Sequence, residues 1–165
     1  VVEREGQAAR LRHTPMGIRQ AGIPAQQMVC KMLVMGSILG CRTPALAMAA
    51  ALTVGRSPFL RIDSRRKKRY NGEDEQASME EMKQERILEE RASLFKTVGN
   101  SDHALLAAVY MKWQDEGSGS RKRFCESLGL SFNGMRDMMQ AVNQMDSSLK
   151  AAGYTSSAES DSYSH

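Results

Sequence analysis

Residues 42–54, which read RTPALAMAAALTV, decide the fold class of this 165-residue chain. Thr43 can cap the N-terminus of a helix, Pro44 suits its first turn, and Gly55 follows as a stop. Alanine and leucine occupy nearly every side of the predicted helix, and a helix that is apolar all round is buried among other elements. Many of these side chains are small, so a neighbouring helix can approach closely. The stretch therefore predicts a buried helix in an α-helical core.

Helical patterns also precede this stretch. Thr14 and Pro15 supply a capping residue and a first-turn proline. From Pro24 to a stop at Gly40, apolar residues recur every three or four positions, which indicates an amphipathic helix of about four turns. Its stripe consists of Met28, Met32, Met35 and Leu39. The chain has 12 methionines, and we expect methionine to fill core positions that leucine or phenylalanine often hold.

Further helices follow a charged stretch that contains the turn signal Asn71-Gly72. Residues 78–96 are strong helix formers with a thin apolar stripe, so this helix should lie on the surface or project from it. Another helix starts at Ser101, and a long final helix is capped by Ser131 and stops at Gly153. The apolar positions of the final helix are Met135, Met138, Val142, Met145 and Leu149. Because no stretch alternates convincingly with period two, the predicted fold class is an all-α helical bundle.

Composition excludes several classes of protein. Charged residues make up 25% and apolar residues 41%, as in globular proteins, and the formal net charge of +4 permits polyanion binding without demonstrating it. Cys30, Cys41 and Cys125 are widely spaced, so we expect reduced thiols of an intracellular protein, nuclear or cytoplasmic. The longest apolar run is about half of the ~20 residues that a membrane span needs, so no membrane contact is expected.

The chain starts at Val1 without an initiator methionine and should be part of a longer protein.

The neighbouring residues Asp102 and His103 could suggest a catalytic or metal-binding pair. Adjacent side chains on a helix diverge by about 100°, so the two cannot easily share a proton or a metal ion. Ser101 is a good N-cap, and Asp102 in the first turn complements the helix dipole. No P-loop, GxSxG, HExxH or CxxC motif is present. We therefore expect a capped helix start here and neither a catalytic nor a metal-binding residue in the chain.

The basic run RRKKR at residues 65–69 has two interpretations. It could bind phosphate groups or act as a nuclear import signal. Alternatively, the acidic residues at 73–75 and in the following helix neutralise it, and the stretch is a solvated insertion. The cations Lys31, Lys112, Arg123 and Arg136 could likewise meet phosphate or be solvated only. Both interpretations stay open on these residues alone.

A series of short motifs gives the chain a resemblance to a known family. In order, they are HTPMG at 13–17, KML at 31–33 before Cys41, SPF at 57–59, SDH at 101–103, Tyr110 with Trp113, FC at 124–125, and Gly153-Tyr154. Over residues 11–154 they resemble the helicase-associated region of DEAH/RHA RNA helicases, and most of all the RNA helicase A-type branch. The segment between SPF and SDH is longer and more charged than is usual in that family.

The resemblance implies a domain organisation and a function. Residues 1–23 would be the truncated end of a winged-helix domain, 24–154 a ratchet-like bundle with a charged insertion at about 61–96, and 155–165 a disordered tail. In the parent protein this region would pack against two RecA-like domains and form one wall of a channel for single-stranded RNA. ATP and Mg²⁺ would be bound by those RecA-like domains, whose motifs are absent here, so no cofactor is expected in this chain.

Roles for individual residues follow from the resemblance and from the final helix. Contacts to single-stranded RNA, or to structured RNA or DNA, are expected mostly at phosphate and sugar. The residues expected to make them are Asn133, Arg136, Gln140 and Arg123. A structural signature of the bundle is expected at Ser101, Asp102, His103, Trp113 and Lys31. The alternative function is a non-catalytic helical interaction module whose charged insertion at 61–96 recruits a protein partner.

Overall fold

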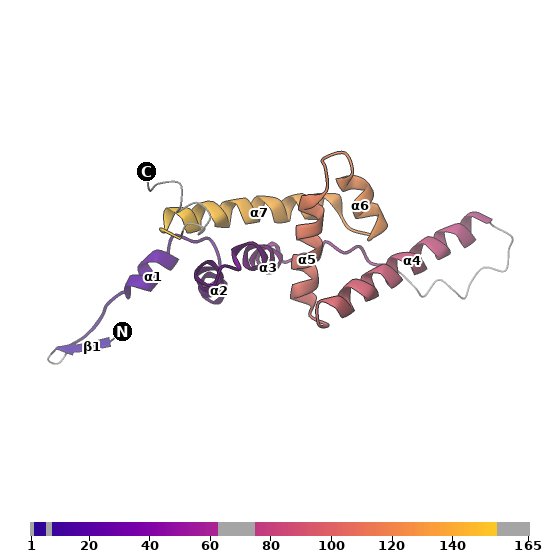
Figure 1. Cartoon of the computed structure of the whole chain (residues 1–165). Helices are drawn as coiled ribbons and strands as arrows, with labels where there is room; N and C mark the ends of the chain where they lie inside the picture. Colours follow the sequence, from indigo (N-terminus) through magenta and orange to yellow (C-terminus); the bar gives the residue numbers. More distant parts are fainter. Residues whose placement is uncertain (1, 6–7, 63–74, 155–165) are drawn as a thin grey trace.

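The computed structural model describes residues 2–5, 8–62 and 75–154. These residues form a two-stranded hairpin followed by helices (Figure 1). The elements are β1 (Val2–Glu5), β2 (Ala8–Leu11), α1 (Pro15–Gln20), α2 (Gln27–Ile38), α3 (Arg42–Val54), α4 (Glu75–Thr97), α5 (Asp102–Asp115), α6 (Arg121–Ser127) and α7 (Phe132–Ala151). The predicted all-α bundle is confirmed by α1 to α7.

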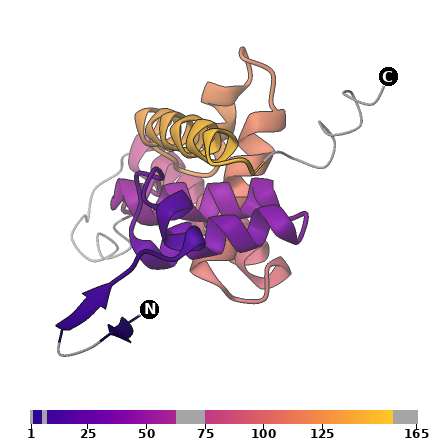
Figure 2. The ribbon, with the colours of Figure 1, turned by 90° about the vertical axis from the view of Figure 1, so that its left-hand side faces the viewer.

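The hairpin pairs β1 with β2 in antiparallel register, with Val2 opposite Leu11 and Glu5 opposite Ala8. It extends away from the helices and is joined to them through α1 (Figure 2). The sequence did not reveal these strands, because a strand of four residues places only two side chains on each face, too few for a visible alternation. The division of the chain at residue 23 into a winged-helix end and a bundle stays a prediction.

Helix α3 lies at the centre of the bundle and contacts α2, α5 and α7. Three of its alanines are fully enclosed, which confirms the buried helix expected from this stretch. The helix begins at Arg42 with Cys41 in the cap position, so the prediction that Thr43 caps it is wrong. Proline is tolerated in the first turn because the backbone N–H groups there lack intrahelical partners, and Pro44 therefore does not mark the first residue.

Helices α2 and α3 approach most closely at Gly36. A Cβ atom built on Gly36 would lie 2.5 Å from Cβ of Ala45, which is closer than packed atoms can come. Glycine inside a helix costs about 1 kcal/mol relative to alanine. The close packing of the two helices has to offset that cost, so Gly36 sets the distance between them.

The packed side of α2 differs from the predicted one. Met28 and Leu39 of the predicted stripe are 77% and 72% exposed. The core-facing residues of α2 are instead Val29, Cys30, Leu33, Val34 and Gly36. Because α2 is apolar on both sides, periodicity cannot choose between them, and Gly36 selects the side that α3 can approach. The helix also begins at Gln27 rather than at Pro24.

Helix α7 buries the stripe that the sequence predicted. Its buried residues are Met135, Met138, Val142, Met145 and Leu149. Ser131 caps the helix, since its Oγ accepts a hydrogen bond from the Gly134 backbone N–H at 3.1 Å. Gly153, with a φ of +86°, follows the last turn in the left-handed conformation that favours glycine. Helix α7 packs against α3, and its buried methionines lie on the side that faces the core.

An ion pair joins the start of α3 to the end of α7. The buried Arg42 donates from Nε to Oδ1 of Asp146 at 2.7 Å and also donates to the carbonyl oxygen of Tyr154. Asp146 lies 3.4 Å from Nζ of Lys150 as well. Removing Asp146 would leave the buried guanidinium of Arg42 without its carboxylate, whereas Asp146 is partly exposed and keeps Lys150 as a second partner. The contact therefore fixes the register of α7 on α3.

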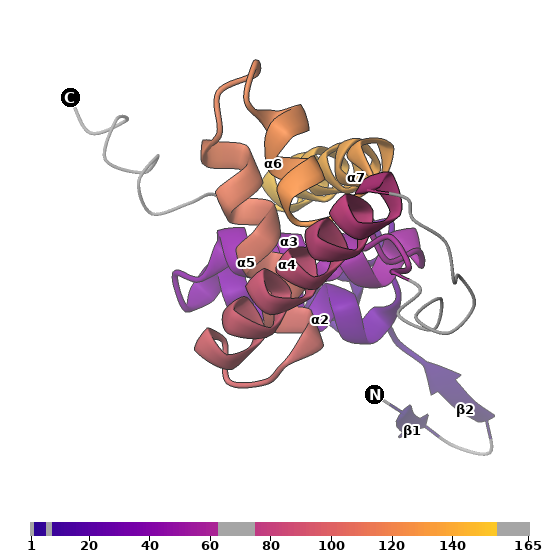
Figure 3. The ribbon, with the colours of Figure 1, turned by 90° about the vertical axis from the view of Figure 1, so that its right-hand side faces the viewer.

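Helix α4 lies on the surface, as predicted, and crosses one end of the bundle beside α6 (Figure 3). Ile87 is buried, whereas Met79 and Met82 are 68% and 59% exposed. The predicted basic run at 65–69 and the predicted disordered tail at 155–165 lie outside the described residues.

Replacing Gly36 by alanine should lower the free energy of unfolding by about 1–3 kcal/mol, because the added methyl group meets Ala45. The normal gain in helix propensity is smaller than this steric cost. Urea denaturation of Gly36→Ala measures the difference. The double variant Gly36→Ala/Ala45→Gly should recover much of the loss. A single variant more stable than the parent chain would contradict the close approach.

Candidate nucleic-acid interface

The outward side of α7 carries three of the residues predicted to bind nucleic acid. Asn133, Arg136 and Gln140 are exposed, and their spacing of three and four residues places them on one side of the helix. The methionine stripe occupies the other side and faces α3. The fold therefore gathers these three side chains on one solvent-facing surface.

The same side continues along the helix with residues that sequence reasoning missed. Asn143, Gln144 and Ser147 are exposed there. We call the set of Asn133, Arg136, Gln140, Asn143, Gln144 and Ser147 the α7 outer face. Polar residues that recur every three or four positions, on the side opposite the methionine stripe, are the sequence pattern that could have identified them. Side-chain amides both donate and accept hydrogen bonds, so this face can bond phosphate oxygens, ribose hydroxyls and base edges.

The charge on the α7 outer face is small. Arg136 supplies a cation, and the exposed carboxylate of Asp137 follows it directly in the chain. Further cations, Lys122 and Arg121, belong to the first turn of α6. Binding of a polyanion at this face would therefore depend on amide hydrogen bonds as much as on ion pairing.

An aromatic cluster lies at the N-terminal end of α7. Phe132 is 38% exposed and meets the buried Trp113 edge-on, with 6.3 Å between ring centroids. Trp113 also packs on Tyr110, at 6.2 Å. The guanidinium carbon of Arg121 lies 4.6 Å from the Trp113 ring centroid, and Nε of Arg121 donates to the Glu116 carbonyl oxygen at 3.1 Å. The cluster supports Phe132, a partly exposed ring of the kind on which a base can stack.

Arg123 lies elsewhere. It belongs to α6 and lines a pocket together with Lys83 and Arg86 of α4. No described residue of α7 lines that pocket. Three of the four residues predicted to contact nucleic acid therefore lie together on α7. The fourth, Arg123, lies between α4 and α6 instead.

The predicted structural signature is divided between buried and exposed positions. Ser101 caps α5, because its Oγ accepts a hydrogen bond from the Ala104 N–H at 3.3 Å, and Trp113 is enclosed in the core. Asp102 and His103 are both exposed. Lys31 is exposed and lines a shallow pocket between α1 and α2. The helix start that the SDH motif predicts is therefore present at α5. The role of Asp102 and His103 in joining this helix to its neighbours stays a prediction.

Apolar side chains cover the outer side of α1 and α2. The exposed fraction is 43% for Met16, 77% for Met28, 41% for Met35 and 72% for Leu39. Met16 and Met28 line one shallow pocket, so these two side chains lie close together where α1 meets α2. We call Met16, Met28, Met35 and Leu39 the α1–α2 apolar patch. Exposed apolar side chains gathered in one region are typical of surfaces that contact another protein part.

Potential metal ligands and cysteine thiols are the remaining reactive groups of the chain. Across residues 2–5, 8–62 and 75–154, no group of three or more His, Cys, Asp or Glu side chains is placed to hold a metal ion. In the same ranges no helix combines the length and apolar character needed to cross a membrane. Burial raises the pKa of the Cys30 and Cys125 thiols, whereas Cys41 is exposed.

Comparison with known proteins identifies the family. Residues 28–106 match the ratchet-like helicase associated domain, HA2. The chain is 32% identical over 134 residues to DExH-box ATP-dependent RNA helicase DExH4, chloroplastic, of Arabidopsis thaliana, an alignment that covers 77% of this chain and 9% of that relative. It is 27% identical over 157 residues to ATP-dependent RNA helicase DHX29 of Homo sapiens, covering 91% of this chain and 10% of the relative. The chain thus spans about a tenth of the length of these relatives.

The helical bundle and these matches define a ratchet-like helicase-associated domain. The chain belongs to the helicase-associated regions of DEAH-type RNA helicases. The family expected from the short motifs is therefore confirmed. The narrower assignment to the RNA helicase A-type branch stays a prediction.

The three thiols should differ in reactivity. In the native chain near pH 8, Cys41 should react rapidly with a chromogenic thiol reagent, while Cys30 and Cys125 react only after unfolding. Burial blocks access of the reagent to these two thiols. It also raises their pKa, which leaves less of the nucleophilic thiolate at a given pH. Absorbance traces with and without denaturant measure the phases. Persistence of the rapid phase in Cys41→Ser would contradict the assignment.

Proposed function

We propose that this chain is the accessory region of an ATP-dependent DExH RNA helicase and that the α7 outer face contacts single-stranded RNA. The observation that carries the proposal is the row of exposed amides with Arg136 on a helix whose other side is fixed to α3. The partly exposed Phe132 ring at one end adds a stacking surface. Such a face suits sequence-tolerant contact with phosphate, sugar and stacked bases.

The motor of the helicase would pack on a different surface. In this proposal the α1–α2 apolar patch is covered by the RecA-like domains of the parent protein, and the hairpin with α1 is the end of a winged-helix domain. Burial of exposed methionine and leucine side chains favours such packing. ATP and Mg²⁺ would be bound by the RecA-like domains. The part played by this chain is to hold the strand while the motor moves it.

The triple variant Asn133→Ala/Arg136→Ala/Gln140→Ala should weaken single-stranded RNA binding by roughly tenfold, equivalent to loss of a few modest hydrogen bonds and one ion pair. Filter binding over a salt series measures the affinity. Arg136→Ala alone should reduce the slope of log affinity against log salt by about 1, since one phosphate contact is lost.

Arg56→Ala provides the matched control for this titration, because Arg56 is exposed on the segment after α3 and lies outside the α7 outer face. Its affinity for RNA should stay close to that of the parent chain. The proposal would be wrong if RNA binding survived the triple variant unchanged and was abolished by deleting residues 61–75.

The double variant Met28→Ser/Leu39→Ser tests the motor contact. In this chain alone it should change the melting temperature little, because both side chains are largely exposed. In the parent helicase it should lower RNA-stimulated ATP hydrolysis several-fold, since the motor loses apolar contact area. Met79→Ser/Met82→Ser is the matched control, with exposed methionines on α4. Equal losses in the two double variants would argue against a specific motor contact.

A further inference from the structure

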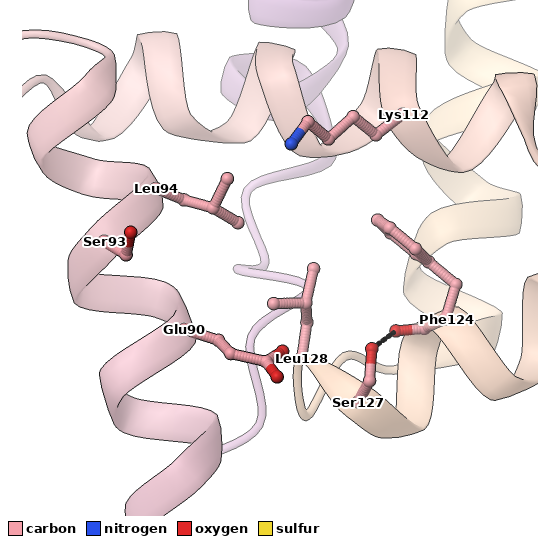
Figure 4. Close-up of a pocket in the computed structure, with 7 residues that line it drawn as sticks. All are labelled: Glu90, Ser93, Leu94, Lys112, Phe124, Ser127 and Leu128. Carbon is pink, nitrogen blue, oxygen red and sulfur yellow. Dashed lines mark hydrogen bonds between the residues drawn. The ribbon is translucent and has the colours of Figure 1, made fainter.

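A groove with an apolar floor runs between α4 and α6. Two pockets of about 290 and 300 Å³ lie along it and share Glu90 and Ser127 in their walls. The apolar floor consists of Ile87, Leu94, Phe124 and Leu128. Figure 4 shows Leu94 and Phe124 directed toward each other across the space between the two helices. Each pocket is at the lower size limit of small-molecule sites, so the groove suits a row of side chains better than one enclosed ligand.

Arg91 holds the groove in shape. Its Nε donates to the Leu128 carbonyl oxygen at 2.8 Å and its Nη2 donates to the Gly129 carbonyl oxygen at 2.6 Å. The same guanidinium donates to the carbonyl oxygen of Leu60 and lies 4.7 Å from the Phe59 ring centroid. These contacts tie α4 to the turn between α6 and α7. The groove is therefore preformed rather than a gap beside a loosely placed helix.

The rim of the groove is rich in cations. Lys83 and Arg123 stand on its two walls, and Lys112 reaches over it from α5 (Figure 4). None of these three has an ion pair within 4 Å among the described residues. Glu90 is engaged by Arg86 at 3.4 Å, which leaves Glu126 as the other carboxylate in the lining. The rim is thus complementary to an anionic partner, while the floor is complementary to an apolar one.

We propose that the groove between α4 and α6 docks an acidic amphipathic segment of a protein partner. Apolar side chains spaced three or four residues apart would enter the two pockets, and flanking aspartate or glutamate would face Lys83, Lys112 and Arg123. A nucleic-acid strand fits less well, because two carboxylates line the groove and its aromatic ring, Phe124, is half-buried in the floor. This role goes beyond RNA binding, which is proposed for the α7 outer face.

Selection from a phage-displayed library of random peptides tests the proposal, with the whole chain as the immobilised target. Peptides of about 16 residues give roughly four helical turns. The recovered peptides should share apolar residues three or four apart with flanking acidic residues. A fluorescently labelled recovered peptide should lose about tenfold or more in affinity when the target carries Lys83→Glu/Arg123→Glu, as expected for reversal of two exposed charges.

Lys96→Glu/Lys122→Glu is the matched control. It makes the same charge change on the same two helices, at exposed positions that do not line the groove. Circular dichroism of both variants checks that the helices are intact. The peptide should bind the control variant with nearly the affinity of the parent chain.

Three results would overturn the proposal. If the recovered peptides lack the acidic amphipathic pattern, or if both charge-reversed variants lose affinity equally, the groove is not a specific peptide site. If a single-stranded RNA of about ten nucleotides loses affinity for Lys83→Glu/Arg123→Glu but not for the control, the groove binds nucleic acid instead. Because the α7 variants are measured separately, failure of RNA binding there leaves the peptide result interpretable.

Discussion

The contact between Gly36 of α2 and Ala45 of α3 is the constraint on which the rest of the bundle depends. The missing side chain at Gly36 lets the two helices approach closely, and the alanines of α3 let α5 and α7 pack on it as well. A core made from small side chains on one helix and larger ones around it reaches native packing density without voids. Every surface on which a function is proposed is placed by the helices that surround α3.

The packing of α7 shows how the core determines which side chains face the solvent. The methionine stripe has to face α3, so the amides and Arg136 have to face outward. Arg42 and Asp146 then oppose sliding of α7 along α3, because slippage would separate the buried guanidinium of Arg42 from its carboxylate partner. The outer face therefore lies on a helix held in place by the core, and such preorganisation would limit the entropy lost in the proposed contact with a strand.

Three surfaces of the domain differ in chemistry and so favour different partners. The α7 outer face is polar and nearly neutral, the α1–α2 apolar patch is hydrophobic, and the α4–α6 groove combines an apolar floor with a cationic rim. The first suits a flexible strand, the second the body of a folded domain, and the third a short amphipathic segment. A small helical domain can therefore serve several contacts at once, because its core uses only one side of each peripheral helix.

The sequence by itself determined the local features: the α-helical class, the caps at Thr14, Ser101 and Ser131, and the buried stripe of α7. Each depends on residues within a few turns of one another, so spacing reveals it. Only the tertiary structure decided which side of α2 is buried, that Arg42 meets Asp146, and that Arg123 joins α4 rather than the α7 outer face. When a helix has apolar residues on both sides, its pattern does not show which side is buried. Residues about a hundred positions apart produce no periodic pattern in the sequence either. Both features therefore depend on how the helices pack.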